Sequence, residues 1–262
     1  MLFGKIFSNS KNVRLLLLEL LMIFIGVYLA FLFQNYSEDK KISKEKEKVL
    51  VSLKLELETF RTTFPGFSEY QKDKNAEWDS VFAAVEMAEF YTWRYLEPQY
   101  NFQVIEYALD QERTEVVDFE LYDQLAKLYS SIKRLEHAER MMTEHGQRYR
   151  NINRSWSEES LEYKARMADN RFNFYKFRIA AIDRANIMER ISKTSEKILE
   201  VIHEDLGADK IREADINLLH TYLEERVSRE LIREVYSEYF PHFTNEETES
   251  IIEEWDAEKA KE

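Results

Sequence analysis

The chain has 262 residues, no cysteine and a formal net charge of −13. The acidic balance argues against a nucleic-acid partner, because affinity for phosphates depends on basic side chains, and the lack of cysteine excludes disulfides, thiol catalysis and thiolate metal sites. Five glycines and three prolines leave few turn signals. We therefore expect an all-α protein.

The first predicted element is a transmembrane helix over residues 15–36, preceded by a short basic tail over residues 1–14. Residues 15–33 read LLLLELLMIFIGVYLAFLF, with Glu19 as the one charged side chain and no proline. A helix of this length spans roughly 28 Å, which matches the hydrocarbon core of a bilayer. A lipid bilayer is therefore the first expected partner.

Two other interpretations of this segment are weaker. A cleaved signal peptide has an apolar core of about 7 to 15 residues followed by small residues at the cleavage site. Here the run is longer and ends in FLFQNY, which has no small-x-small pattern. A buried core helix would have to hide an apolar surface on every side, whereas the other predicted helices are amphipathic. We favour an uncleaved anchor.

One side of the predicted span differs from the rest. Gly26, Ala30 and Gln34 fall within about 60° of the direction of Glu19 at 100° per residue. Gly26 and Ala30 have the small-xxx-small spacing that lets two helix backbones approach closely in lipid. These four residues predict a helix contact in a homo-oligomer or with a membrane protein partner. The alternative is ordinary transmembrane composition.

The orientation of the span is left open by its flanks. Lys5, Lys11 and Arg14 precede it, and five lysines between positions 40 and 48 follow it. The positive-inside rule then favours a cytoplasmic C-terminal part by five to three. The N-terminal amine and the tendency of short basic tails to remain inside reduce that margin, so either side is compatible with the sequence.

Beyond the span we expect a charged juxtamembrane helix over residues 37–64, a helical bundle domain over 65–243, and a short C-terminal helix with an acidic tail over 244–262. Turns are predicted at Pro65-Gly66, Pro98, Gly146, Gly207 and Pro241. Antiparallel packing of the helices between these turns gives a bundle.

Apolar stripes at helical spacing place the individual elements. The first stripe lies on the juxtamembrane helix, and a second helix is expected from residue 68 to about 95, with Trp78, Val81, Val85 and Ala88 on one side. A third helix begins near Asp118 as N-cap, a fourth runs from about 170 to 206 with Gly207 as its C-terminal stop, and a fifth lies before Pro241. Thr244 and Glu247 predict a capping box for the last helix. The stripe residues are Leu50, Leu53, Leu57, Phe60 and Phe64 in the first helix, Leu121, Leu125, Leu128, Ile132 and Leu135 in the third, Ile187, Ile191, Ile198 and Ile202 in the fourth, and Ile216, Leu219, Leu223 and Val227 in the fifth.

Two stretches resemble a bacterial group of uncharacterised single-span membrane proteins. The first carries Glu19, Gly26, Ala30, Asn35, Tyr36, Glu38, Lys40 and Lys41; the second comprises Tyr107-Ala108-Leu109, Glu115-Val116-Val117, Leu121, Leu125 and Tyr129. Tyr36 stands where the group more usually has Trp. The resemblance covers about half of the chain and implies an inner-membrane bacterial protein. It implies no known activity.

Catalytic and cofactor motifs are missing from the sequence. The scattered glycines exclude phosphate-binding loops, and there is neither a His-Glu-x-x-His pair nor a Gly-x-Ser-x-Gly elbow. The one metal candidate is the weak pair Glu200 and His203, whereas di-iron bundles need two such pairs and two further glutamates. We therefore predict no cofactor and no metal.

Two further clusters have a structural and a functional interpretation. Polar side chains on the third helix suggest a solvated face, and aromatic side chains around Pro98 suggest either the cap of a bundle core, which we favour, or a ligand groove. The polar cluster comprises Glu136, His137, Glu139, Glu144 and His145. The aromatic cluster comprises Phe90, Tyr91, Trp93, Tyr95, Tyr100 and Phe102.

The favoured function is a membrane-anchored interaction or sensing module. The alternatives are a tethered carboxylate- or metal-dependent enzyme and a purely structural tether.

Overall fold

The computed structural model describes residues 10–84, 100–110, 117–148, 152 and 155–259. Within these ranges it contains seven helices and no strand, which confirms the all-α prediction. The helices are α1 (Ser10–Ala84), α3 (Gln103–Leu109), α4 (Phe119–Gln147), α5 (Leu161–Asp205), α6 (Ala208–Glu224), α7 (Arg229–Tyr239) and α8 (Asn245–Lys259). The chain divides into two compact units, Met1–Lys48 and Val49–Glu262. We call the second unit the body.

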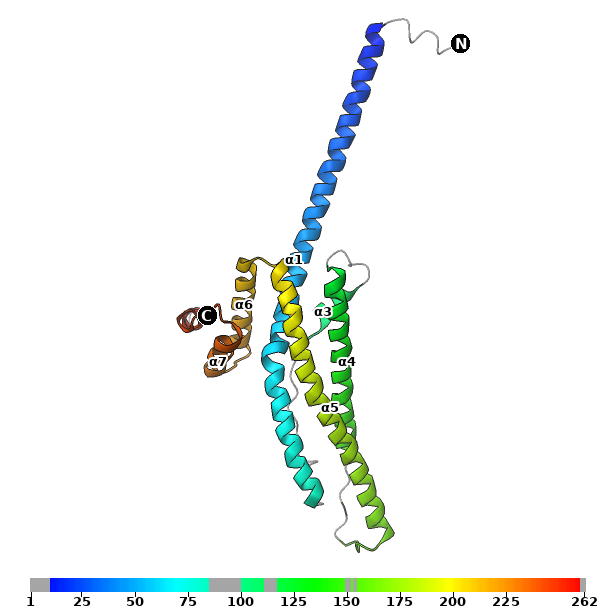
Figure 1. The fold of residues 1–262 in the computed structure, drawn as a ribbon, viewed down its shortest axis with the longest axis vertical. Coiled ribbons are helices and arrows are strands. Elements are labelled where there is room, and N and C mark those ends of the chain that lie inside the picture. Colours follow the sequence, from blue (N-terminus) through cyan, green and yellow to red (C-terminus); the bar gives the residue numbers. More distant parts are fainter. Residues whose placement is uncertain (1–9, 85–99, 111–116, 149–151, 153–154, 260–262) are drawn as a thin grey trace, which may run out of the picture. The chain divides into compact units, whose positions relative to one another are not determined.

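The main core of the body is built by the predicted apolar stripes. The stripe residues of α1, α4 and α5 lie in one buried cluster, together with Ile105 and Ala108 of α3. Leu53, Leu57, Phe60 and Phe64 each have 0 % exposed surface. The long helices α4 and α5 pack along each other, as Figure 1 shows in green and yellow-green. The spacing of three and four residues therefore identified the buried faces correctly.

Two smaller clusters complete the body. Trp78 of α1 packs edge-on against Phe177 of α5, with a distance of 5.0 Å between ring centroids, in a cluster with Met142 and Phe174. The second cluster joins α6, α7 and α8 around Tyr236 and Phe240, whose rings are stacked 4.5 Å apart. Leu55 of α1 packs against this cluster. The helix α1 therefore presents apolar side chains to all three clusters.

The predicted turn at Pro65-Gly66 is wrong, because α1 continues through both residues. Proline inside a helix removes the N–H that would bond the carbonyl four residues earlier. Here that carbonyl belongs to Arg61, and it accepts a hydrogen bond from Ser192 Oγ of α5 at 3.3 Å. The neighbouring helix therefore supplies the donor that Pro65 lacks. The expected separate helix over 68–95 is, as far as residue 84, the end of α1; residues 85–99 lie outside the described ranges.

The predicted fifth helix is two helices, α6 and α7. The break is a Schellman motif, in which Val227 N–H bonds Tyr222 C=O at 3.0 Å and Arg226 N–H bonds Leu223 C=O at 3.1 Å. Arg226 has φ of 60°, in the left-handed region that usually takes glycine. Because an arginine occupies this position, the sequence has no glycine to signal the turn.

The helix ends follow local capping rules in most places. Asp118 accepts the Leu121 N–H at 2.8 Å, as predicted. The capping box also forms, because Thr244 N–H donates to Glu247 Oε2 at 2.9 Å and Glu247 N–H donates to Thr244 Oγ1 at 3.1 Å. The helix α5 begins at Leu161, earlier than expected, with Ser160 as N-cap. The helix α5 ends at Asp205, close to the predicted stop at Gly207, and Gly207, with φ of −66°, is also the N-cap of α6.

Candidate functional site

A buried charge cluster, formed by Lys54, Glu58, Arg61, Asp215 and His242, links α1 to α6 and to the segment before α8. Lys54 has 0 % exposed side chain and pairs with Asp215 and with Glu58, the latter at 3.3 Å between Nζ and Oε1. Arg61 Nε donates to Glu58 Oε2 at 2.7 Å. His242 Nε2 lies 2.9 Å from Asp215 Oδ2. Arg61, Glu58, Lys54 and Asp215 thus form a row of alternating positive and negative charges.

Burial shifts the pKa of Glu58 in this cluster and that of His203, a nearby residue of α5. It raises the pKa of Glu58, an effect that Lys54 and then Arg61 oppose. It also lowers the pKa of His203, and the nearby cation Lys54 acts in the same direction. Because Lys54, Glu58 and Asp215 have at most 1 % exposed side chain, a substrate cannot reach them. We therefore interpret the buried charge cluster as structural.

A second buried polar group joins α1, α4 and α5. Arg184 has 0 % exposed side chain, and it donates to Glu139 Oε1 at 3.1 Å and to Gln71 Oε1 at 2.8 Å. Tyr100 O–H donates to the other oxygen of Glu139 at 3.0 Å. Burial, and next the Glu139 charge, raise the pKa of Tyr100, so its hydroxyl remains a donor. This network fixes the register of three helices.

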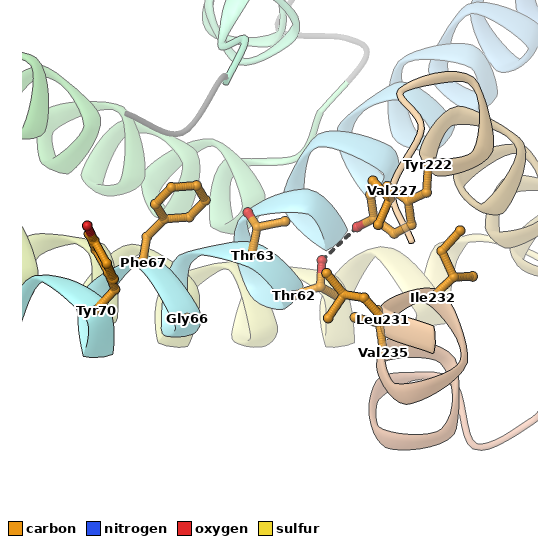
Figure 2. Close-up of a pocket in the computed structure, with 10 residues that line it drawn as sticks. All are labelled: Thr62, Thr63, Gly66, Phe67, Tyr70, Tyr222, Val227, Leu231, Ile232 and Val235. Carbon is orange, nitrogen blue, oxygen red and sulfur yellow. Dashed lines mark hydrogen bonds between the residues drawn. The ribbon is translucent and has the colours of Figure 1, made fainter. Parts of the chain in front are cut away.

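The best candidate for a binding site is an apolar groove of about 330 Å³ between α1 and α7. Figure 2 shows the groove residues of α1 along one side and Leu231, Ile232 and Val235 of α7 along the other. The groove residues are Thr62, Thr63, Gly66, Phe67, Tyr70, Tyr222, Val227, Leu231, Ile232 and Val235. Leu231 is 49 % exposed although it is a large apolar side chain. The groove is therefore open to solvent.

Gly66 and the hydroxyl groups determine what the groove can bind. A Cβ added to Gly66 would meet no atom within 4 Å, so the missing side chain leaves open space along α1. Thr62 Oγ1 and Tyr222 O–H are hydrogen-bonded to each other at 2.7 Å (Figure 2), and Thr63 Oγ1 donates to Thr59 C=O at 2.7 Å. Since these hydroxyls already have partners, the groove favours an apolar occupant.

The predicted contact residues of the span lie together on α1 in the first unit. Glu19, Gly26, Ala30 and Gln34 are all exposed, and Gln34 Nε2 donates to Glu38 Oε1 at 3.0 Å. Gly26 has no neighbour within 4 Å of an added Cβ. The helix contact along this stripe stays a prediction.

The two candidate metal-binding residues, Glu200 and His203, lie in different environments. Glu200 is exposed, whereas His203 is half-buried and its Nε2 has no hydrogen-bond partner in the described part of the chain. Among the described residues, no group of three or more His, Asp or Glu side chains lies close enough to hold a metal ion.

The polar cluster on α4 is divided between the surface and the interior. Glu136 and Glu144 form ion pairs with Lys133 and Arg148 at the surface, and His137 is also exposed. His145, in contrast, is 5 % exposed and its Nδ1 lies 2.9 Å from Asn173 Oδ1, and Glu139 belongs to the Arg184 network. The interpretation as a solvated face is therefore correct for only part of the cluster.

Two of the predicted aromatic residues fall in the described part of the chain. Tyr100 lies edge-on to Phe64 with 5.8 Å between centroids, and Phe102 lies edge-on to Tyr129 at 6.0 Å. Both pack against the main core, as the core-cap interpretation predicts. Phe90, Tyr91, Trp93 and Tyr95 lie outside the described residues, with Pro98.

Comparison of the chain with protein-family models, with curated proteins and with solved structures found no match. The resemblance to single-span bacterial membrane proteins therefore stays a prediction.

Proposed function

We propose that this chain is a single-pass membrane protein whose body is an interaction or sensing module. The observation that carries the proposal is the exposure of the apolar segment in the first unit. Its large apolar side chains between Leu18 and Phe33 are 46–71 % exposed, and none of the most apolar window is buried. Such a surface is costly in water and favourable in a bilayer. This supports a membrane anchor over a buried core helix.

The body supplies the binding part of the proposal. Its two buried polar groups are inaccessible or fully engaged, and they offer no reactive centre. The groove between α1 and α7 instead presents an open apolar surface on which the hydroxyls of Thr62, Thr63 and Tyr222 are already paired. A membrane-anchored binding module is therefore better supported than a tethered enzyme. The bacterial inner membrane, suggested by the resemblance, is part of the proposal, and either side of that membrane is compatible with it.

Filling the groove at Gly66 is expected to leave the body folded. Gly66→Ala should raise the free energy of unfolding by about 0.5–1 kcal/mol, because glycine is unfavourable in a helix interior and the new methyl group meets no atom. Urea unfolding followed by circular dichroism measures this change. A decrease in stability would show that the space beside Gly66 is not open. Gly66→Leu then provides a folded protein with an occupied groove.

Site-specific photocrosslinking tests binding in the groove. A photoreactive phenylalanine analogue at Leu231 in native membranes should give a discrete crosslinked product, and the same analogue at Phe119 should not. Phe119 is a suitable control because it is 87 % exposed and begins α4, outside the groove. Gly66→Leu should reduce the Leu231 product several-fold. Equal products from both positions, or a Leu231 product that Gly66→Leu does not change, would contradict the proposed binding surface.

A further inference from the structure

A second cavity of about 530 Å³ lies on another part of the body and shares no residue with the groove. Its walls come from α1, from the start of α3 and the residues just before it, and from α6 with its C-cap. Leu55, Val104 and Leu218 provide apolar surface. The volume is in the range of pockets that hold small organic molecules, about 300–1,000 Å³.

The charged groups of this cavity are both acidic. Glu56 lies on α1 and Glu225 at the C-cap of α6, and the described lining includes no Lys, Arg or His. Glu56 Oε1 accepts the Asn101 N–H at 3.0 Å. Neither carboxylate has an ion-pair partner within 4 Å among the described residues.

Three other acidic side chains that are largely removed from solvent in the body have a cationic partner, which Glu56 lacks among the described residues. Glu58 faces Lys54 and Arg61, Asp215 faces Lys54, and Glu139 faces Arg184. Glu56 is half-buried without such a cation. Burial raises its pKa to about 7, and the Asn101 N–H only partly opposes this effect. A carboxylate removed from water without a counter-ion is unfavourable, and a cationic ligand would compensate for that cost.

The end of α6 adds to the negative potential of the cavity. Helix C-termini carry a partial negative charge, and Glu225 is the C-cap residue of this helix. Hydroxyl groups of Ser52, Thr59 and Thr221 also line the cavity, although Thr59 and Thr221 donate to the carbonyls of Leu55 and Asn217. The cavity therefore combines negative charge with apolar walls.

We propose that this cavity binds a small organic cation, a primary amine on an aliphatic stem. The ammonium group pairs with the Glu56 carboxylate, Glu225 contributes at the exposed rim, and the stem contacts Leu55, Val104 and Leu218. A metal ion fits less well, because no metal-binding group of three or more His, Asp or Glu side chains occurs among the described residues and Leu55, Val104 and Leu218 make part of the wall apolar. This inference goes beyond the proposed function and does not depend on the groove.

Titration calorimetry of the full chain in lipid nanodiscs at pH 8, with 1,5-diaminopentane as the probe, tests the proposal. The diamine should bind, and 1-pentanol, which has the same stem without the ammonium groups, should bind at least tenfold more weakly. Glu56→Gln should weaken diamine binding by at least tenfold. Glu253→Gln removes the same charge from an exposed position on α8 and should leave binding unchanged.

The pH dependence gives a second readout. The groups around Glu56 are Ser52 and Thr59 on α1, Tyr100 and Asn101 before α3, and Thr221 and Glu225 at the end of α6. Since the ammonium group needs an ionised Glu56, whose pKa is about 7, affinity should rise about tenfold from pH 6 to pH 8, and Glu56→Gln should remove this rise.

Three results would overturn the proposal: no heat of binding with the diamine, equal affinity of the wild type and Glu56→Gln, or equal affinity for pentanol and the diamine.

Glu56→Gln should fold normally, because glutamine resembles the protonated carboxyl group. A circular dichroism melt within a few degrees of the wild type verifies this, and Glu56→Asp, which keeps the charge, should retain more affinity than Glu56→Gln. Retained affinity in Glu56→Gln but not in Glu56→Asp would contradict the charge-based mechanism.

Discussion

Asp215→Ala is expected to lower the free energy of unfolding by about 3–5 kcal/mol, because removing one partner of a buried ion pair leaves the other charge poorly compensated. Lys54, with 0 % exposed side chain, would keep only Glu58 at 3.3 Å as its counter-ion. Urea unfolding of the body, followed by circular dichroism, measures the loss.

A neighbouring acidic residue provides the matched control for this substitution. Glu213 lies on the same helix and pairs with Lys210 at the surface, where the two side chains are 63 % and 46 % exposed. Glu213→Ala should cost less than about 1 kcal/mol, because exposed pairs contribute little. Combining Asp215→Leu with Lys54→Met should recover much of the stability. If Asp215→Ala and Glu213→Ala destabilise the protein equally, the buried charge cluster does not hold α6 against α1.

Arg184→Met is expected to destabilise the body by about 2–4 kcal/mol, because it removes a buried cation together with its hydrogen bonds to Glu139 and Gln71. The expected loss is smaller than for Asp215, since Glu139 is 15 % exposed and can be hydrated. Denaturant unfolding again provides the measurement.

Arg178 on the same helix is the control for Arg184. It pairs with Asp79 at the surface, with 35 % of its own side chain and 50 % of the Asp79 side chain exposed. Arg178→Met should cost less than about 1 kcal/mol. Similar losses for the two arginine variants would contradict the assignment of Arg184 to a stabilising buried network.

The sequence predicts the parts of the fold that depend on local periodicity and capping. The stripes on α1, α4 and α5 identify the main core, and Asp118 and Thr244 identify two helix starts, because each pattern involves residues within a few turns of one another. Pro65 misleads, because the donor that replaces its missing N–H is Ser192, far away in the sequence. Arg226 conceals the α6–α7 turn because it adopts a conformation typical of glycine.

The buried polar groups and the two cavities could not be predicted from the sequence either, because they also depend on contacts between residues far apart in the chain. Lys54 and Glu58 have the spacing of a surface ion pair, and the sequence does not reveal that Lys54 also pairs in the interior with Asp215, which is 161 residues away. One signal was present in the sequence: Leu55 falls outside the main stripe of α1, which indicates a second contact face on this helix. Pairing that face with α6–α8 requires tertiary contacts that periodicity does not reveal.

Flotation after carbonate extraction at pH 11 shows whether residues 15–36 hold the intact chain in a membrane. The chain carries one epitope at each terminus, and the control variant combines Phe24→Asp with Ile25→Asp, which should cost about 2.5–3.5 kcal/mol per charge near the bilayer centre. We expect the wild type to float with membranes at full length with both epitopes, and the variant to shift to the soluble fraction. A soluble wild-type chain, or a membrane-processed chain without its N-terminal epitope, would contradict this expectation.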